Sequence, residues 1–416
     1  MDTMKILVLG GGPDQAALIR KLQATGHEVI FADYYERPPA VETGARHFCV
    51  STLDEGAILD LAKVERVGKV LTSGTDPALV TGARVSAVLG LGFPVSPDIV
   101  DLVTHKGEMK RRLRDLGIPT AAPMVWHTQA GAALPTVVFP AVVKPCDCAG
   151  SLGVERVDNE EELRSALGRA REWSRTGQAL VEAFVEGREL SIDAFVDQGI
   201  AQVLMITESE KLPELRQFPI VRSWHPALDS DSLIAEVQKI VQAIVDGFGI
   251  GVGPLLVQLI QSAQGLSVLE FGVRIAGGGK YAFVERVTGF DLLQAYVDVS
   301  FGTWRGPLQF APGPAFAAMT YVYCHPGSYL EIDGLAELQA DGVIDEAFLY
   351  KLPGAQIAGH TASRDRPLSY LCSAQTQAAL VEKLTRAEQE LRVLDDQGID
   401  IRLRHPVTGM RGSRAA

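Results

Sequence analysis

An apolar segment that ends in a lysine and runs into a loop of small residues sets the first constraint on this chain. Residues 140–143 read Pro-Ala-Val-Val and predict a buried strand that ends at Lys144. The loop that follows contains Gly150, Ser151 and Gly153, so its backbone N–H groups can approach a ligand closely. A cation beside bare N–H groups is suited to phosphate oxygens. The segment therefore predicts a phosphate-binding loop.

A second apolar segment carries both an acid and a base. Residues 268–273 predict a buried strand, and the two-residue repeat of a strand places Glu270 and Arg274 on one face. A buried carboxylate needs a cation or strong hydrogen bonds, so such a pair more often marks a site than a stability device. Positioning and charge neutralisation dominate the catalysis of phosphoryl transfer. The lysine, the loop and the carboxylate are the components that this chemistry requires.

Composition narrows the classes of partner and the cellular compartment. The chain has 416 residues and a formal net charge of -12. This length is typical of roughly three domains, and the acidic balance argues against a nucleic-acid or anionic-membrane partner. Its five cysteines are scattered and odd in number, which predicts neither a disulfide framework nor a zinc site. With no signal-peptide core or membrane-spanning run, we expect a cytoplasmic protein.

The first hundred residues alternate between short apolar strands and helices. Strands are predicted at 5–9, 29–32 and 69–72, and this alternation is typical of a parallel sheet covered on both faces. Gly10 and Gly12 imitate part of a dinucleotide-binding fingerprint, with Asp33 at the end of the second strand, but Gln15 replaces the third glycine. We therefore interpret the motif as a tight turn in a Rossmann-like domain that binds no NAD.

The middle of the chain predicts antiparallel hairpins. Four strands are expected at 189–196, 201–207, 255–261 and 266–273, in two pairs joined by short turns. We expect one helical stretch over 96–116, an irregular polar stretch over 208–231, and a linker at 312–314.

The ordered set of these motifs resembles the ATP-grasp superfamily of ATP-dependent carboxylate ligases, from Met4 to Gly279. The order is His105-Lys106-Gly107, the Lys144 strand and loop, residues 180–189 (Leu-Val-Glu-Ala-Phe-Val-Glu-Gly-Arg-Glu), and the Glu270 strand. A C-terminal Pro326-Gly327 and the turn at 352–354 look most like the amino-acid ligase branch.

The resemblance implies a multidomain fold that combines α/β and α+β parts. We expect a Rossmann-like N-terminal domain (1–105), an ATP-grasp small or lid subdomain with its preceding helix (106–186), an antiparallel-sheet central subdomain (187–312), and a small C-terminal α+β subdomain (313–416). It also implies ATP and Mg²⁺ as cofactors, with Mn²⁺ as the alternative metal, and a homodimer.

The resemblance also implies a set of site residues. Arg274 and Lys144 would be catalytic, and Arg274 would face the acyl phosphate. Glu270 would hold the metal. The residues implied in ATP binding are Lys106, Lys144, Gly150, Ser151, Gly153, Glu182, Ala183, Val185, Glu189 and Glu270. Within that set, Glu182 would accept a hydrogen bond from the adenine amino group.

This chain departs from the family pattern at two positions near the metal. Gln258 stands where the family commonly has a second acidic ligand, and Gly272 stands where it commonly has asparagine. A glutamine oxygen can still coordinate a hard cation, but it brings no formal charge. Glu285 is a neighbouring acid that would compensate.

The expected activity joins a carboxylate, activated as an acyl phosphate, to an amine with release of ADP. Both substrates would be small molecules, and an amino acid is the expected carboxylate by analogy. Arg222 is our candidate for the substrate carboxylate because a guanidinium binds it through two hydrogen bonds. Gly277 and Gly278 would let backbone amides approach the acyl group. The alternatives are a bicarbonate-using carboxylase or carbamoyl-forming enzyme, and a nucleotide-binding protein with a degenerate site.

Overall fold

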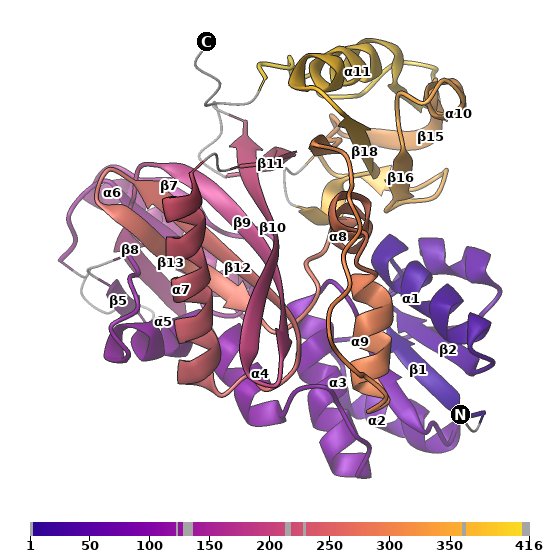
Figure 1. The fold of residues 1–416 in the computed structure, drawn as a ribbon, viewed down its shortest axis with the longest axis horizontal. Helices are drawn as coiled ribbons and strands as arrows, with labels where there is room; N and C mark the ends of the chain where they lie inside the picture. The colour runs from indigo at the N-terminus through magenta and orange to yellow at the C-terminus, as the bar shows by residue number, and fades with distance from the viewer. Residues whose placement is uncertain are drawn as a thin grey trace.

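The computed structural model describes residues 3–121, 124–127, 136–212, 218–227, 230–359 and 363–409. These residues form a parallel N-terminal sheet, an antiparallel lid sheet, a large central sheet and a small C-terminal sheet. In Figure 1 the central sheet lies between the lid on one side and the N-terminal sheet on the other. None of the described helices is long and apolar enough to cross a membrane.

The N-terminal sheet is parallel throughout, as the alternation of strands and helices predicts. Along its first strand, Ile6 and Val8 enter one apolar core and Leu7 and Leu9 enter another, so both faces are covered. In sheet order the strands are β3 (Arg46–Cys49), β2 (Glu28–Asp33), β1 (Lys5–Leu9) and β4 (Lys69–Leu71). The helices and 3-10 turn around it are α1 (Pro13–Ala24), η1 (Pro39–Thr43), α2 (Glu55–Val64) and α3 (Asp76–Leu89).

The single helical stretch expected over 96–116 is wrong, because two helices occupy it. They are α4 (Pro97–Thr104) and α5 (Lys106–Asp115). His105 leaves the helical conformation with ψ near 99°, and its Nδ1 accepts a hydrogen bond from the Glu108 N–H at 3.3 Å. This capping contact starts a new helix at Lys106.

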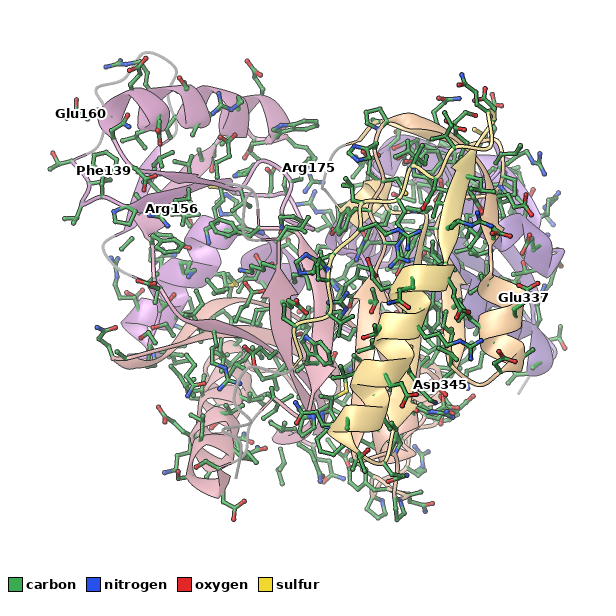
Figure 2. The ribbon with its side chains drawn as sticks, turned by 90° about the horizontal axis from the view of Figure 1, so that it is seen from above. Phe139, Arg156, Glu160, Arg175, Glu337 and Asp345 are labelled. Atoms are coloured by element: carbon green, nitrogen blue, oxygen red, sulfur yellow. The ribbon has the colours of Figure 1, made fainter. Side chains whose placement is uncertain are left out.

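The lid is a four-stranded antiparallel sheet covered by one helix. In sheet order its strands are β5 (Met124–His127), β8 (Ala179–Ala183), β6 (Ala141–Pro145) and β7 (Glu155–Val157). Its helix α6 (Glu160–Trp173) begins at the cap residue Asn159, whose side chain accepts from the Glu162 N–H. Figure 2 shows Phe139, Arg156 and Glu160 of the lid far from Glu337 and Asp345 of the C-terminal region.

The central sheet has eight strands and contains both predicted hairpins, β9–β10 and β12–β13. In sheet order its strands are β13 (Gly265–Gly272), β12 (Gly253–Ser262), β9 (Arg188–Asp197), β10 (Ile200–Lys211), β11 (Ile220–His225), β14 (Phe316–Tyr321), β18 (Leu368–Ala374) and β16 (Glu346–Leu349). The helix α7 (Asp231–Phe248) packs against β10.

The irregular stretch expected over 208–231 is wrong where the structure describes it. β10 continues to Lys211, and β11 pairs with both β10 and β14. β11 reads Ile-Val-Arg-Ser-Trp-His, and its four middle residues are buried although two of them are polar. This pattern is neither an apolar run nor a strict alternation, so it and the prolines nearby concealed the strand. Residues 213–217 and 228–229 lie outside the described residues.

The C-terminal region shares the central sheet, since β14 pairs with β11. The small sheet beside it contains β17 (Gln356–Ile357), β15 (Gly327–Asp333) and β19 (Arg392–Asp395), with α10 (Leu335–Ala340), η2 (Ser363–Asp365) and α11 (Gln377–Glu390). Two further helices, α8 (Lys280–Thr288) and α9 (Leu292–Ser300), connect the central sheet to the N-terminal sheet. One apolar core joins these helices to the N-terminal sheet, because Ile6 and Val8 of β1 belong to the same cluster as Leu292 and Tyr296 of α9.

Candidate active site

A cavity of about 250 Å³ opens between the lid sheet and the hairpin β12–β13. We call it the lid cavity. Its apolar walls come from Ala121, Val142, Phe184, Val185, Ile260 and Leu269. Its charged lining comes from Lys106, Lys144, Glu182, Glu189, Lys211 and Glu270. The sequence-predicted residues of the Lys144 strand, the 180–189 segment and the Glu270 strand therefore meet in one place.

Two lysines hold Glu182 at the floor of this cavity. Lys144 forms an ion pair with one carboxylate oxygen of Glu182, and the Nζ of Lys110 lies 3.1 Å from the other. Lys110 Nζ also donates to Thr120 Oγ1 at 2.7 Å. Burial lowers the pKa of Lys110 to about 8. Burial alone would raise the pKa of Glu182, but the charges of the two lysines outweigh it and lower that pKa.

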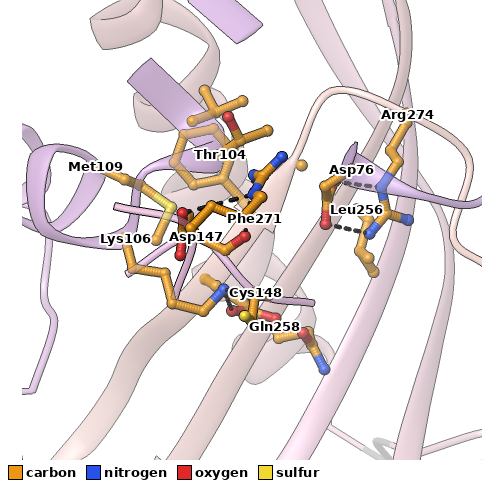
Figure 3. Close-up of a pocket in the computed structure, with 14 residues that line it drawn as sticks. Asp76, Thr104, Lys106, Met109, Asp147, Cys148, Leu256, Gln258, Phe271 and Arg274 are labelled. Carbon is orange, nitrogen blue, oxygen red and sulfur yellow. Dashed lines mark hydrogen bonds and ion pairs between the residues drawn. The ribbon is translucent and has the colours of Figure 1, made fainter. Parts of the chain in front are cut away.

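A third lysine approaches the carboxylate of Glu270. The Nζ of Lys106 lies 3.0 Å from Glu270 Oε2 and donates to the Cys148 carbonyl at 2.7 Å. Figure 3 shows Lys106, Cys148 and Gln258 gathered on one side of this site. Burial would raise the pKa of Glu270, but Lys106 and Lys144 hold it below its usual value. Glu270 therefore remains an anion that already attracts a cation.

Gln258 and Glu270 are cross-strand partners. They lie opposite each other on β12 and β13, so their side chains share one face of the sheet. Gln258 Nε2 donates to Glu189 Oε1 at 3.3 Å, and Glu189 forms an ion pair with Lys211. Among the described residues, no group of three or more His, Cys, Asp and Glu side chains is arranged to hold a metal ion. Oxygen donors from Gln258 and Glu270 are the pair available at this position.

The small-residue loop adopts left-handed backbone conformations. Gly150, Ser151 and Gly153 all have positive φ, with Ser151 at 61°. A Cβ on Gly153 would lie 2.8 Å from the Pro145 ring, so this position requires glycine. The Gly150 carbonyl accepts a hydrogen bond from Ser363 Oγ at 3.1 Å, which ties the loop to η2.

A second cavity, of about 480 Å³, lies between the N-terminal domain and the central sheet. We call it the domain cavity. It is lined by the turn of Gly10 and Gly12, by Gly277 and Gly278, and by Arg274. The lid cavity and the domain cavity meet at four shared lining residues: Ser151, Ile220, Gln258 and Glu270.

Arg274 reaches this junction while paired with an acid of the N-terminal domain. Its Nε and Nη2 both donate to the Asp76 carboxylate, the second at 2.8 Å. The dashed lines in Figure 3 mark this pair. Burial would lower the pKa of Arg274, but Asp76 raises it.

Arg222 does not line either cavity. Its side chain is 1% exposed and pairs with Glu210 at 3.1 Å, while its Nη2 donates to the His405 carbonyl at 3.0 Å. The expectation that Arg222 meets a substrate carboxylate is therefore corrected, because structural acids already occupy its guanidinium. Glu285 does not lie where it could compensate for the missing acid near the metal, since its charged neighbours are Asp291 and Lys21 rather than Glu270.

Sequence reasoning missed Lys110, Lys280 and Asp76. Lys110 lies one helical turn after Lys106, so the i,i+4 spacing could have placed both on one face. Lys280 lines the domain cavity at 3% exposure, and its Nζ donates to Thr207 Oγ1 at 2.7 Å and lies 3.6 Å from Asp193. Burial lowers the pKa of Lys280. A lysine directly after three glycines was the available signal.

Comparison with known proteins finds a known domain in the middle of the chain. Residues 137–281 match the model of the ATP-grasp domain. The chain is 27% identical over 278 residues to a formate-dependent phosphoribosylglycinamide formyltransferase from Ignicoccus hospitalis, covering 64% of this chain and 67% of the relative. The protein of the same name from Sulfurisphaera tokodaii is 26% identical over 293 residues, covering 65% and 70%.

Solved structures share the fold over nearly the whole chain. An L-amino acid ligase from Bacillus licheniformis superimposes with a TM-score of 0.78 at 22% identity, covering 95% of this chain and 100% of that one. An N5-carboxyaminoimidazole ribonucleotide synthetase from Thermotoga maritima gives a TM-score of 0.71 at 18% identity, with the same two coverages. At these identities the likeness concerns the fold.

Proposed function

Because the chain contains an ATP-grasp domain and has the corresponding fold, we propose that it is an ATP- and Mg²⁺-dependent ligase. It activates a carboxylate as an acyl phosphate and joins it to an amine, releasing ADP and phosphate. The observation that carries this proposal is the junction of the two cavities at Gln258 and Glu270. A nucleotide in one cavity and a small acid in the other would bring their reacting groups together there.

The lid cavity supplies what ATP binding needs. Its apolar walls suit the adenine ring, whose edge would pair with the backbone at Ala183 and Val185. Lys106, Lys144 and the glycine loop would contact the phosphates, and Glu189 the ribose. Glu182 already has both carboxylate oxygens next to lysines. We therefore assign it to holding those lysines rather than to the adenine amino group.

The donor set fits a hard divalent cation. Glu270 and Gln258 present oxygen atoms side by side on adjacent strands, and Mg²⁺ prefers oxygen ligands and keeps waters and phosphate oxygens in its shell. The ammonium group of Lys106 beside Glu270 shows that this carboxylate attracts positive charge. Mg²⁺, or Mn²⁺, held there would neutralise phosphate charge.

The side chains act by orientation and charge stabilisation. The attacking nucleophile belongs to the amine substrate, so no Ser, Cys or His nucleophile is required. Arg274 would stabilise the negative charge of the acyl phosphate. Gly277 and Gly278 lie on the same wall of the domain cavity, where their backbone can approach the acyl group. The lid and its loop would exclude water from the acyl phosphate.

The carboxylate substrate is proposed to be an amino acid, supported by the fold shared with an L-amino acid ligase. A second candidate is formate with a phosphate-bearing amine, supported by the names of the formyltransferases that match 64% and 65% of this chain. Small molecules are the partners in both cases. We also expect a homodimer, which light scattering of the purified protein measures.

The test is ADP release with ATP and Mg²⁺ across a matrix of amino acids, singly and in pairs. Formate with phosphoribosylglycinamide and bicarbonate form separate arms. Turnover that requires one carboxylate and one amine together supports the ligase and names its substrates. Turnover with bicarbonate alone identifies a carboxylating enzyme instead. ATP binding without ADP release in every arm contradicts the proposal and indicates a degenerate site.

A further inference from the structure

The guanidinium of Arg274 is held from another domain. Asp76 lies in the first turn of α3, and its carboxylate accepts from Nε and Nη2 of Arg274, which follows β13. The two residues are 198 positions apart in the chain. Their side chains are 25% and 13% exposed, so solvent weakens this pair less than a surface pair. A two-hydrogen-bond contact of this kind fixes the plane of the guanidinium.

This pairing leaves part of Arg274 available to a ligand. A guanidinium has five N–H donors. The Asp76 carboxylate accepts a hydrogen bond from Nε and one from Nη2, and the Ile275 carbonyl accepts one from Nη1 at 3.1 Å. One N–H on each terminal nitrogen has no partner among the described residues. Because Arg274 lines the domain cavity beside Glu270, these donors are positioned for oxyanions at the cavity junction.

The absence of a side chain at Gly272 provides the space that the Asp76 carboxylate occupies. A Cβ built on Gly272 would lie 3.4 Å from Asp76 Oδ1, so a longer side chain there would meet the carboxylate. Gly272 is also the position where the family resemblance leads us to expect asparagine. In this chain an acid from the N-terminal domain fills the space instead.

A second acid of the N-terminal domain holds the segment that follows Arg274. Asp14 of α1 accepts hydrogen bonds from the N–H groups of Gly278 and Gly279 at 3.0 and 2.9 Å. The backbones also approach closely, because a Cβ on Gly277 would lie 2.8 Å from the Gly74 carbonyl. The N-terminal domain therefore contacts the Arg274 to Gly279 segment at two independent carboxylates.

We propose that Asp76 is a positioning residue that aims Arg274 at the phosphoryl group, so that the N-terminal domain is part of the reaction centre. This inference rests on the proposed ligase function for its kinetic consequences only. The geometry itself concerns where Arg274 can bind an oxyanion. Burial would raise the pKa of Asp76, but Arg274 and Lys106 lower it, so the carboxylate is ionised at neutral pH.

The first test measures binding of inorganic phosphate to the full-length protein saturated with Mg²⁺ and ADP. Asp76→Asn should weaken phosphate binding by about tenfold, because hydrogen bonds to charged groups are strong only when aligned. Affinity for ADP should stay unchanged. Asp101→Asn is the matched control, since Asp101 also pairs with an arginine, Arg84 at 2.9 Å, but lies outside both cavities. Equal phosphate affinities in the two variants would overturn the proposal, as would no phosphate binding by the unaltered protein.

Gly272→Val provides a second variant that keeps both charges. Its γ-methyl groups extend from a Cβ that would lie 3.4 Å from Asp76 Oδ1 and 3.7 Å from Arg274 Cγ and Nε, and should separate the two side chains. Weakened phosphate binding with unchanged ADP binding is expected here as well. If Asp76→Asn fails to fold, this variant decides, and unaltered phosphate affinity in it rejects the positioning role.

Kinetics separate positioning from a structural role. Asp76→Asn should lower kcat by about 10²-fold, since misplaced catalytic groups lose that much, while the KM for ATP stays constant. Adding Asp76→Asn to Arg274→Lys should cost little more than Arg274→Lys alone, because both act on one contact. Additive losses contradict the proposal. If the unaltered protein releases no ADP with any substrate pair, yet Asp76→Asn weakens phosphate binding, the ligase function fails and the positioning role stands.

Discussion

Two buried charged networks in this molecule each pair basic side chains with two glutamates but differ in charge balance. The lid network consists of Lys106, Lys110, Lys144, Glu182 and Glu270 at the lid cavity. The tail network lies beneath the C-terminal tail and consists of Arg222, Arg402, Glu210, Glu388 and His405. Three lysines face two glutamates in the first, whereas two arginines face two glutamates in the second.

The difference indicates which network awaits a ligand. An uncompensated buried charge is costly, so an excess persists where a bound group will neutralise it. Four residues of the lid network line the lid cavity, and with Lys110, which pairs with Glu182, the network has one positive charge in excess, which suits an anionic nucleotide. None of the five tail residues lines the lid cavity or the domain cavity. Burial of an arginine is therefore a poor guide to function until its charge partners are counted.

Arg222→Met should break the tail network and give the largest effect on stability. It removes the partner of Glu210 at 3.1 Å and leaves buried acids with less compensation. Loss of one partner of a buried pair costs about 3–5 kcal/mol of unfolding free energy. Urea unfolding measures this loss, with Arg84→Met, in an exposed pair, as the control. ADP release per folded molecule should be unchanged. A fall in turnover without a fall in stability would assign Arg222 to the site after all.

Lys144→Met should lower turnover and leave the fold intact, which is the reverse of the result expected for Arg222→Met. It removes the charge excess of the lid network, so the phosphates lose a preorganised cation, and kcat should fall by about 10²–10³-fold. Lys110 still pairs with Glu182 at 3.1 Å, so the fold should persist. ADP release and circular dichroism measure the two properties. Lys383→Met, whose lysine donates to the Ser373 carbonyl outside both cavities, is the control. Retained turnover in Lys144→Met would contradict the role assigned to the excess charge.

The lid network was largely predictable from sequence because its signals are local. An apolar run followed by Lys144, and the alternation around Glu270, can be read within a few residues. The parallel N-terminal sheet followed from similar local alternation, whereas the multidomain fold class came from the family resemblance. The position of Gln258 opposite Glu270 came from family resemblance, and the cross-strand register places the two side by side.

The tail network and Asp76 were not predictable because their partners are distant in the chain. Arg222 lies among prolines, a context that predicts a loop cation, yet its partner carbonyl belongs to His405, 183 residues away. Asp76 at the start of a helix has an ordinary explanation, since acids stabilise helix N-termini. Only the packing of two domains shows that Arg274 is its partner.

Gln258→Glu tests the charge balance by adding a negative charge instead of removing a positive one. A second carboxylate opposite Glu270 would cancel the excess positive charge of the lid network and add an anionic oxygen for Mg²⁺. The Mg²⁺ concentration for half-maximal ADP release should fall by about tenfold, because ligand charge tunes cation affinity. Gln264→Glu, in the exposed turn between β12 and β13, is the control. An unchanged Mg²⁺ requirement would place the metal elsewhere.

Glu182→Gln tests the lid network through the pH dependence of stability. The lysines lower the pKa of Glu182 below its usual 4.5 in the folded state. Its stabilising contribution is therefore complete above pH 4.5 and is lost as the pH falls through the folded-state value. The difference in unfolding free energy between the two proteins should shrink on acidification, with a slope below about 1.4 kcal/mol per pH unit. Urea unfolding from pH 6 down to pH 2 measures it, with the exposed Glu337→Gln as the control. A difference that grows on acidification would mean that Glu182 is protonated within the network, and the excess positive charge there would then be larger than the ion pairs indicate.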